Sequence, residues 1–305
     1  MTRLTCLLAA TLALVAPQTP VFRSTADVVP LFVTVTDAGG RLVTGLPRDV
    51  FEVLDNGQPQ PITLFDASAQ PVRLMPLIDL SGSMSDNLGL LRRACTELFA
   101  HLASGDSARG GTFGQQIVLA PEFSRDAASM MELFPSFVSP TAPTPLWRAV
   151  DRAMTELAKA PMGRRVILVL SDGKDSDPAA AEKPVTAAQI VERSRREDIM
   201  VYAVGLRSAP GPISPGGVRS LSSVLASTTP DPGLSALAHE TGGGYVGLSA
   251  RDDLAQAFAH VIEELHSQYL IGFAPPGRDG LLHTIEVRLK DARLKAQARR
   301  TYVAK

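Results

Sequence analysis

The sequence predicts an α/β protein in which a doubly wound, mostly parallel sheet is inserted in a small β-sandwich built from the N- and C-terminal flanks. Two observations lead to this prediction. Near both ends of the chain, apolar residues recur at every second position, whereas the middle alternates short apolar runs with helical periodicity. Runs such as residues 166–170 are apolar at successive positions, which is typical of parallel strands covered on both faces.

Length and composition allow a sizeable core but indicate no general affinity for charged polymers. With 305 residues, of which 45% are hydrophobic, the chain can form one larger domain and a smaller one. Its 30 basic and 31 acidic residues give a formal net charge of -1. Since this balance creates no overall field toward nucleic acid or an anionic membrane, we expect no nucleic-acid partner.

Residues 1–20 have the composition of a signal peptide. Arg3 precedes an apolar run over residues 4–16, which ends in small residues and is followed by a polar segment. The run is too short to span a bilayer comfortably, and an uncleaved N-terminal anchor is the alternative. We therefore expect an exported protein, periplasmic or extracellular, with no transmembrane span in the mature chain. Removal of the signal would leave Cys95 as the only cysteine, which we expect inside a helix core.

Residues 21–70 form the β-rich N-terminal flank. A strand is expected over residues 28–36, and Asp55-Asn56-Gly57 is a strong hairpin signal between residues 51–54 and 61–65. Three or four strands cannot enclose a core alone, so this flank needs partners from elsewhere in the chain.

Residues 71–266 form the larger domain. Its periodicity predicts strands over residues 72–80, 112–113, 116–120, 165–170, 200–205 and 245–248, and helices near 88–102, 127–133, 146–160, 187–196, 234–240 and 249–265. Pro76 interrupts the first strand and predicts either a bulge there or a start of pairing delayed to Leu77.

Residues 267–305 return to the two-residue period and are expected to pair with the N-terminal flank. Strands are predicted over 268–273 and 283–289, with residues 293–303 as the hairpin mate of the second. The basic residues of this hairpin are interpreted as a solvated strand face, with contact to an envelope polyanion as the alternative: Arg288, Lys290, Arg293, Lys295, Arg299 and Arg300.

Oxygen-bearing side chains follow two of the predicted parallel strands. Asp79 stands at the carboxyl end of the first strand, and Ser81 and Ser83 follow at alternate positions, with Gly82 expected to let the backbone curl. Asp172 follows the strand over 165–170, and Thr144 precedes the helix that Pro145 starts. Because ligands of open α/β sheets bind at the carboxyl ends of strands, these five residues should meet at one edge. Carboxylate and hydroxyl oxygens suit Mg²⁺, with Mn²⁺ or Ca²⁺ as alternatives.

These residues resemble the three loops of the metal-ion-dependent adhesion site of von Willebrand factor type A domains. The resemblance implies that Ser81, Ser83 and Thr144 ligate the metal, with Thr144 switching with ligand state, and that Asp79 and Asp172 hold coordinated waters. The flanks are similar to those of exported bacterial, especially acidobacterial, proteins related to this domain. The matching motifs are Val35-Thr-Asp37 with Gly40-Arg41, and Asp49-Val-Phe-Glu-Val53.

The function expected from this reading is cation-dependent protein binding, with the open metal position taking a Glu or Asp carboxylate of a partner, as in cell adhesion. Two alternatives stay open: an envelope scaffold that uses no metal, and a hydrolase with Asp79 as nucleophile. The hydrolase is disfavoured because such enzymes usually carry a second carboxylate two residues on, where this chain has Ser81. We thus expect no enzyme. The long loop from Arg207 to Pro232 is suspected to contribute to partner binding.

Overall fold

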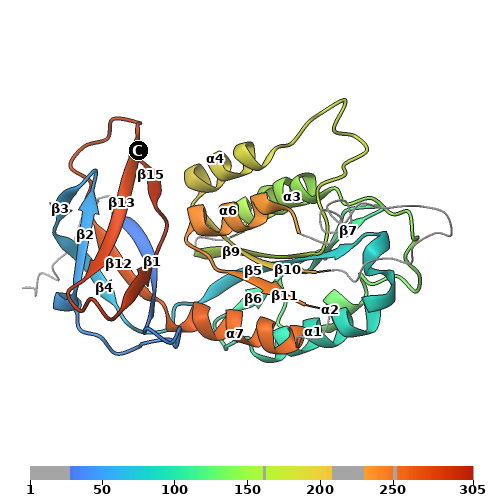
Figure 1. Ribbon diagram of the computed structural model, residues 1–305, viewed down its shortest axis with the longest axis horizontal. Helices are drawn as coiled ribbons and strands as arrows, with labels where there is room; N and C mark the ends of the chain where they lie inside the picture. The colour runs from blue at the N-terminus through green and yellow to red at the C-terminus, as the bar shows by residue number, and fades with distance from the viewer. Residues whose placement is uncertain (1–27, 161–162, 208–229, 250–252, 305) are drawn as a thin grey trace, which may run out of the picture.

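The protein has two parts, a β-sandwich and an α/β part with a central sheet, which lie side by side (Figure 1). The computed structural model describes residues 28–160, 163–207, 230–249 and 253–304. The predicted signal segment and most of the loop from Arg207 to Pro232 lie outside these residues. Within the described residues, no helix is long and apolar enough to cross a membrane.

The central sheet confirms the predicted α/β class. Its strand order is β11-β10-β9-β5-β7-β8, with β6 also paired to β5. All neighbouring strands are parallel except the pair of β7 and β8, which is antiparallel. The strands are β5 (Val72–Leu80), β6 (Ser107–Ala108), β7 (Gly111–Gly114), β8 (Val118–Leu119), β9 (Arg164–Ser171), β10 (Ile199–Leu206) and β11 (Tyr245–Leu248).

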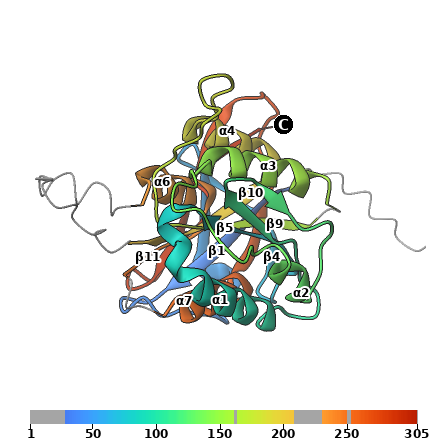
Figure 2. The same cartoon turned by 90° about the vertical axis from the view of Figure 1, so that its right-hand side faces the viewer.

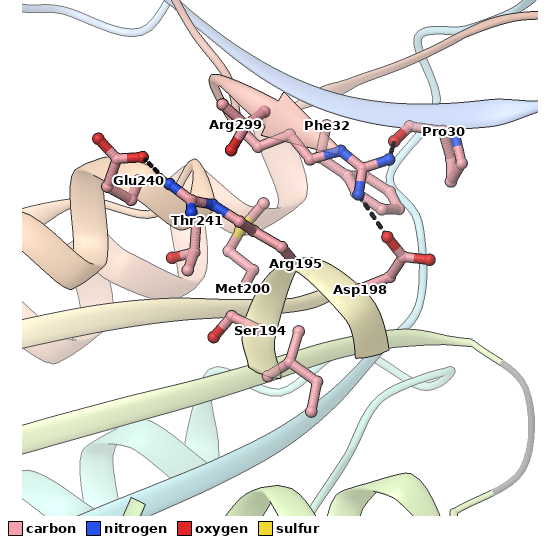
Figure 3. Close-up of a pocket in the computed structure, with 11 residues that line it drawn as sticks. Pro30, Phe32, Ser194, Arg195, Asp198, Met200, Glu240, Thr241 and Arg299 are labelled. Atoms are coloured by element: carbon pink, nitrogen blue, oxygen red, sulfur yellow. Dashed lines mark hydrogen bonds and ion pairs between the residues drawn. The ribbon is translucent and has the colours of Figure 1, made fainter. Parts of the chain in front are cut away.

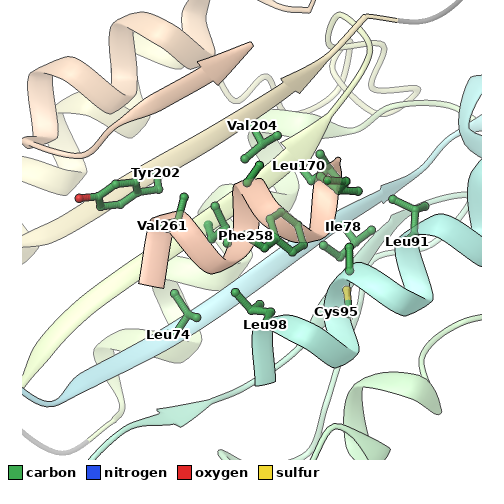
Figure 4. Close-up of a cluster of buried hydrophobic side chains, with 14 of the residues drawn as sticks. Leu74, Ile78, Leu91, Cys95, Leu98, Leu170, Tyr202, Val204, Phe258 and Val261 are labelled. Carbon is green, nitrogen blue, oxygen red and sulfur yellow. The ribbon is translucent and has the colours of Figure 1, made fainter. Parts of the chain in front are cut away.

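Helices cover both faces of this sheet (Figure 2). One face carries α1 (Leu88–Ala100), α2 (Ala128–Met131) and α7 (Leu254–Ser267), and the other carries α3 (Leu146–Ala158), α4 (Ala187–Glu197) and α6 (Pro232–Thr241). Figure 4 shows the first core, where Cys95 of α1 is fully buried, as expected, near Ile78 of β5. The helix α7 starts later than predicted because the Asp253 side chain caps it, accepting hydrogen bonds from the amides of Ala255 and Gln256.

Pro76 is accommodated without a bulge on one side of β5 and by a gap on the other. Pairing with β9 is continuous from Val72 to Ile78, so the predicted bulge is absent there. On the opposite side, β6 pairs with Arg73 and Leu74, and β7 begins pairing at Leu77. The Leu74 carbonyl faces this second side, where it accepts a hydrogen bond from the Arg109 amide. The backbone of Pro76, two residues further on, faces the same side, so the position of its missing N–H falls between the short strands β6 and β7.

The sandwich is built from both ends of the chain, as the sequence predicts. Its sheets have the orders β14-β1-β12-β4 and β15-β13-β2-β3, so each sheet combines two N-terminal with two C-terminal strands. The strands are β1 (Val29–Thr36), β2 (Phe51–Asp55), β3 (Gln58–Gln60), β4 (Ile62–Asp66), β12 (Tyr269–Phe273), β13 (Leu282–Leu289), β14 (Lys295–Gln297) and β15 (Thr301–Val303), and a 3-10 turn, η1 (Arg48–Val50), precedes β2.

Two local expectations in the sandwich are corrected. The Asn56-Gly57 turn forms, with both residues at positive φ, but it joins β2 to the short β3, while residues 62–66 cross to the other sheet. Of residues 293–303, only β15 is the hairpin mate of β13, because β14 pairs with β1 instead. Strands that cross between sheets let a short segment contribute to both layers, which periodicity alone does not reveal.

Candidate metal centre

The predicted site residues follow strands that end at the same edge of the central sheet. β5 and β9 are parallel neighbours, with Ile78 opposite Leu170, so Asp79 and Asp172 leave the sheet side by side. Figure 2 views the molecule from the side of this edge. A 3-10 turn, η2 (Gly82–Asn87), follows Ser81, and the third loop enters α3 through Thr144 and Pro145. We call the side chains of Asp79, Ser81, Ser83, Thr144 and Asp172 the rim.

Asp79 lies at the bottom of the rim and is fully buried. One carboxylate oxygen accepts a hydrogen bond from the Ser81 amide at 2.8 Å, and the other accepts one from the Ser171 hydroxyl at 2.6 Å. The pKa of Asp79 is raised to about 7, chiefly by burial and in smaller part by the nearby charge of Asp172, while the hydrogen bonds from Ser171 and Ser81 lower it. The site therefore concentrates negative charge that a cation would stabilise.

Hydroxyl groups connect the first loop to the carboxylate of another. The Ser83 hydroxyl donates to Asp172 Oδ1 at 2.8 Å, and the Ser81 and Ser83 hydroxyl oxygens are 3.2 Å apart. Ser81 and Asp172 are buried, whereas Ser83 is exposed. The three side chains thus form a chain of oxygen atoms that leads from the interior to the surface.

Thr144 is held beside this group by the loop after Asp172. Its amide donates to the Ser176 hydroxyl and its carbonyl accepts from the Ser176 amide, both at 2.9 Å. Its hydroxyl oxygen lies 3.4 Å from the position that a Cβ would take on Gly173, the residue after Asp172. Thr144 is itself buried. The structure therefore brings all five predicted residues to one edge of the sheet.

Gly82 serves a different purpose from the one expected. Its φ is not in the left-handed region, so no tight curl requires glycine there. A Cβ on Gly82 would instead lie 2.0 Å from the Pro140 carbonyl oxygen, and the Gly82 amide donates to the Ala142 carbonyl. Glycine is needed because the loop before α3 packs directly against the first loop.

The donor set fits a hard divalent cation. It offers three hydroxyls and two carboxylates, all oxygen, and lacks the thiolate or imidazole groups that zinc and copper prefer. Among the described residues, no group of three or more His, Cys, Asp or Glu side chains could hold a metal by itself. Any cation bound at the rim would therefore depend on the hydroxyl groups.

Sequence reasoning missed Ser171 and Ser176. Ser171 is fully buried and donates to Asp79, and its oxygen also accepts from the Gly173 amide at 3.3 Å. The register offered a signal, because pairing of residue 78 with residue 170 puts Ser171 opposite Asp79. Ser176 holds the Thr144 backbone through a contact between separate loops, which the sequence does not signal.

Comparison with known proteins identifies the fold and the domain type. The von Willebrand factor type A domain matches residues 74–229, and no curated protein matches the chain. A solved structure of an aerotolerance-related membrane protein from Bacteroides fragilis is 21% identical, with a TM-score of 0.46. The matched region covers 64% of this chain and 98% of the chain of that protein.

Two further solved structures resemble the chain. A von Willebrand factor type A protein from Catenulispora acidiphila is 14% identical, with a TM-score of 0.48, and covers 93% of this chain and 74% of its own. Proximal thread matrix protein 1 from the mussel byssus, described with a zinc-occupied MIDAS motif, is 14% identical, with a TM-score of 0.45, and covers 68% of this chain and 48% of its own.

Proposed function

The chain belongs to the von Willebrand factor type A family, and we propose that it binds a protein partner through a divalent cation held at the rim. Domains of this family are generally interaction modules without enzymatic activity, and they commonly bind a divalent cation. Mg²⁺ is the ion we assign, with Mn²⁺ and Ca²⁺ as alternatives, since all five candidate groups carry oxygen. The partner group is a Glu or Asp carboxylate.

In this proposal Ser81, Ser83 and Thr144 contact the ion directly, and Asp79 and Asp172 hold its waters. When bound, Mg²⁺ would supply an electrophilic position that an acidic side chain can occupy. Neutral hydroxyls leave that position more attractive to an anion than carboxylates would, because the compensating charges stay farther away. A buried hydrogen bond from the Ser171 hydroxyl orients the Asp79 carboxylate at the bottom of the rim.

The observation that carries the proposal is the hydrogen bond from the Ser83 hydroxyl to Asp172. It connects residues 89 positions apart and leaves a carboxylate and two hydroxyls converging where the chain meets solvent. The contact joins two separate loops, so it holds oxygen atoms from both loops in one group at the edge of the sheet. Ser83 is exposed and can therefore be reached by a partner.

The burial of Asp79 argues against the hydrolase alternative. A nucleophilic carboxylate needs an oxygen that can reach a substrate. Asp79 is fully buried and both of its oxygens accept hydrogen bonds from Ser81 and Ser171. The metal-independent scaffold is the remaining rival, and it predicts partner binding that does not respond to chelation.

Cation binding can be measured first without a partner. Thermal unfolding of the purified protein in EDTA and in millimolar Mg²⁺ should show a higher midpoint with Mg²⁺, because a ligand that binds only the folded state stabilises it. Asp172→Ala should abolish this shift. Asp86→Ala removes an exposed carboxylate from the same turn and is the matched control, which should keep the shift. Equal responses in all three proteins would contradict the proposed site.

Partner binding is tested next by recovery of proteins from the host envelope. Wild type with Mg²⁺ should recover partners that are lost with EDTA and with Asp172→Ala but kept with Asp86→Ala. The same partners in every sample would establish the metal-independent scaffold instead.

We further propose that the protein is exported and that the loop from Arg207 to Pro232 contributes to the partner surface. The loop follows β10, whose carboxyl end lies at the rim edge of the sheet. Residues 208–229 lie outside the described residues, so its role rests on this position alone. Shortening the loop should weaken partner recovery, while Mg²⁺ should still raise the unfolding midpoint. Unchanged recovery would contradict this part of the proposal.

A further inference from the structure

Buried polar atoms without a partner gather in one place. In the described part of the chain, seven buried side-chain nitrogen or oxygen atoms have no hydrogen-bond partner in the protein. All seven belong to residues that line the junction between the sandwich and the α/β part: Arg164, Arg165, Ser194, Arg195, Glu197, Arg299 and Thr301. Unpaired buried polar groups are rare in folded proteins because each costs about 1 to 3 kcal/mol. Their clustering therefore points to a ligand.

The junction contains three adjoining hollows, which we call the seam. All three share Pro30 of β1 and Asp198, the residue after α4. Four of the seven atoms line the smallest hollow, a cavity of about 50 Å³. One water needs roughly 10 to 15 Å³, so this cavity has room for about three to five water-sized groups. It is large enough for a small polyatomic ion.

Two arginines from different parts of the protein reach into this cavity (Figure 3). Arg195 of α4 donates to Glu240 at 2.8 Å, and Arg299, just before β15, pairs with Asp198 and donates to the Pro30 carbonyl at 2.9 Å. These bonds use the terminal guanidinium nitrogens. The Nε–H of each arginine is buried without an acceptor.

Two hydroxyl groups complete the cavity. Ser194, only 2% exposed, comes from α4, and Thr301 is the first residue of β15. Neither hydroxyl has a partner, although both are buried. The cavity thus presents two N–H donors that cannot accept and two hydroxyls that can donate. These four groups match an occupant that accepts several hydrogen bonds.

The charge around the cavity favours an anion. Arg195 and Arg299 have side chains only 19% and 13% exposed, whereas their partners Glu240 and Asp198 are 34% and 55% exposed. Water screens the carboxylates more than the guanidinium groups, so the interior is positive. The whole seam has six arginines against three carboxylates, namely Arg73, Arg164, Arg165, Arg195, Arg278 and Arg299 against Glu197, Asp198 and Glu240.

We propose that the seam binds a small oxyanion, a phosphate or carboxylate group, between Ser194 and Arg195 of the α/β part and Arg299 and Thr301 of the sandwich. An oxyanion offers several acceptor oxygens to the four unpaired donors at once. Because these donors come from both parts of the protein, the bound anion would hold the sandwich and the α/β part together. This site lies at the amino ends of β9 and β10, away from the rim, and does not depend on the cation.

The test uses inorganic phosphate, sulfate and acetate, each against sodium chloride at matched ionic strength. In isothermal titration calorimetry and in thermal unfolding, at least one of the three oxyanions should bind wild type and raise its unfolding midpoint. Phosphate or sulfate alone would indicate a phosphate-like group, and acetate alone a carboxylate. If no oxyanion exceeds chloride, the seam takes only water and the proposal is wrong.

The double variant Ser194→Ala/Thr301→Val removes both hydroxyls and leaves the two ion pairs intact. Without oxyanion it should be as stable as wild type or more stable, because it removes unpaired buried hydroxyls. Its affinity for the oxyanion should fall by about tenfold or more. Thr96→Val is the matched control, since that hydroxyl is on α1 and bonds its own helix. Undiminished binding by the double variant would place the anion elsewhere and overturn the proposal.

A direct reading comes from the Nε–H resonances of the arginines in nuclear magnetic resonance spectra, assigned with Arg195→Lys and Arg299→Lys. Titration with the binding oxyanion should shift the signals of Arg195 and Arg299 and leave that of Arg288, an exposed arginine paired with Glu286, in place. Signals of Arg195 and Arg299 that do not move would also contradict the site.

Discussion

The two ends of the central sheet carry opposite chemistry. At the carboxyl ends of β5 and β9, the rim gathers carboxylates and hydroxyls that hydrogen-bond one another. At the amino ends of β9 and β10, the seam gathers arginines and hydroxyl groups, and several of their buried polar atoms have no hydrogen-bond partner in the described structure. The rim faces solvent through Ser83, whereas the seam is covered by the sandwich.

This difference indicates how each end is stabilised. The rim contains two carboxylates, and in our proposal a bound cation compensates their charge. The seam has an excess of positive charge, and the smallest of its hollows presents Nε–H and hydroxyl donors that have no acceptor in the protein. Substitutions at the rim should therefore change the response to a cation, and substitutions at the seam the response to an anion.

The largest expected effect is at the seam. Arg164 is 6% exposed, donates to the Leu265 carbonyl at 2.6 Å, contacts Gln268 Oε1 and lies over the Phe32 ring at 4.4 Å. Arg164→Met would leave both acceptors without their donor, and the free energy of unfolding should fall by about 3 kcal/mol. Urea unfolding monitored by circular dichroism measures this loss.

The neighbouring Arg165 provides the control. It is partly exposed, and its hydrogen bonds to the carbonyls of Ala158 and Ala160 are 3.4 Å long. Arg165→Met should cost less than about 1 kcal/mol. Equal losses for the two variants would show that Arg164 contributes no more than a surface arginine.

A smaller effect is expected at the rim. Gly82→Ala would force the first loop away from the Pro140 carbonyl, with a loss of about 1 to 3 kcal/mol in the free energy of unfolding. The same movement should abolish the stabilisation by Mg²⁺ but leave binding of an oxyanion at the seam unchanged. Urea unfolding with and without each ligand tests all three expectations.

Gly89→Ala is the matched glycine substitution. A Cβ there lies 3.7 Å from its nearest neighbour, the end of the Arg93 side chain, and the residue is inside α1. This variant should be more stable than wild type by about 0.5 to 1 kcal/mol, because alanine favours the helix. If Gly89→Ala were destabilised and Gly82→Ala were not, the close packing assigned to Gly82 would be contradicted.

The smallest effect concerns a buried polar cluster whose groups are paired, in contrast to the seam. His283 contacts Asp55 at 2.8 Å and Asp279 at 3.2 Å, and Tyr302 donates to Asp55 at 2.9 Å. Hydrogen bonding to Asp279, and then to Asp55, raises the pKa of His283 above 6.5. A raised pKa stabilises the fold fully at low pH, and this contribution disappears as pH rises through the folded-state value.

The stability difference between wild type and His283→Gln, measured by thermal unfolding, should therefore shrink as the pH rises above the ordinary histidine pKa of about 6.5. Asp279→Asn, which removes the principal cause of the shift, should move this decline to lower pH. A difference that stays constant with pH would contradict a charged His283 in the cluster.

Local patterns predicted much of the fold and all five rim residues. Asp79 and Asp172 each follow a buried run, and parallel neighbours end at one edge, so their meeting could be expected before any contact was known. Pro145 marks the start of the next helix and so puts Thr144 in the loop before it. The metal assignment stays a prediction, because the geometry establishes that the five side chains are close and not that an ion binds them. The domain boundaries also stay predictions.

The seam could not be predicted in this way. The sequence placed Arg299 on a solvated strand face, which is wrong, since its side chain is 13% exposed and pairs with Asp198. That contact joins residues 101 positions apart, and the bond to the Pro30 carbonyl joins residues 269 apart. No periodicity records contacts of this range.

The sequence by itself determined most strands and helices along the chain, the insertion of the α/β part in a sandwich, and the residues of the rim. These features follow from side-chain periods and from the geometry of parallel sheets, which act within one element or between neighbours. Only the tertiary structure decided that Pro76 fits a gap between two short strands, that Gly82 admits a second loop, and that four unpaired donors share a cavity. Each of these depends on how closely distant backbones approach, which is settled by packing and not by any local preference.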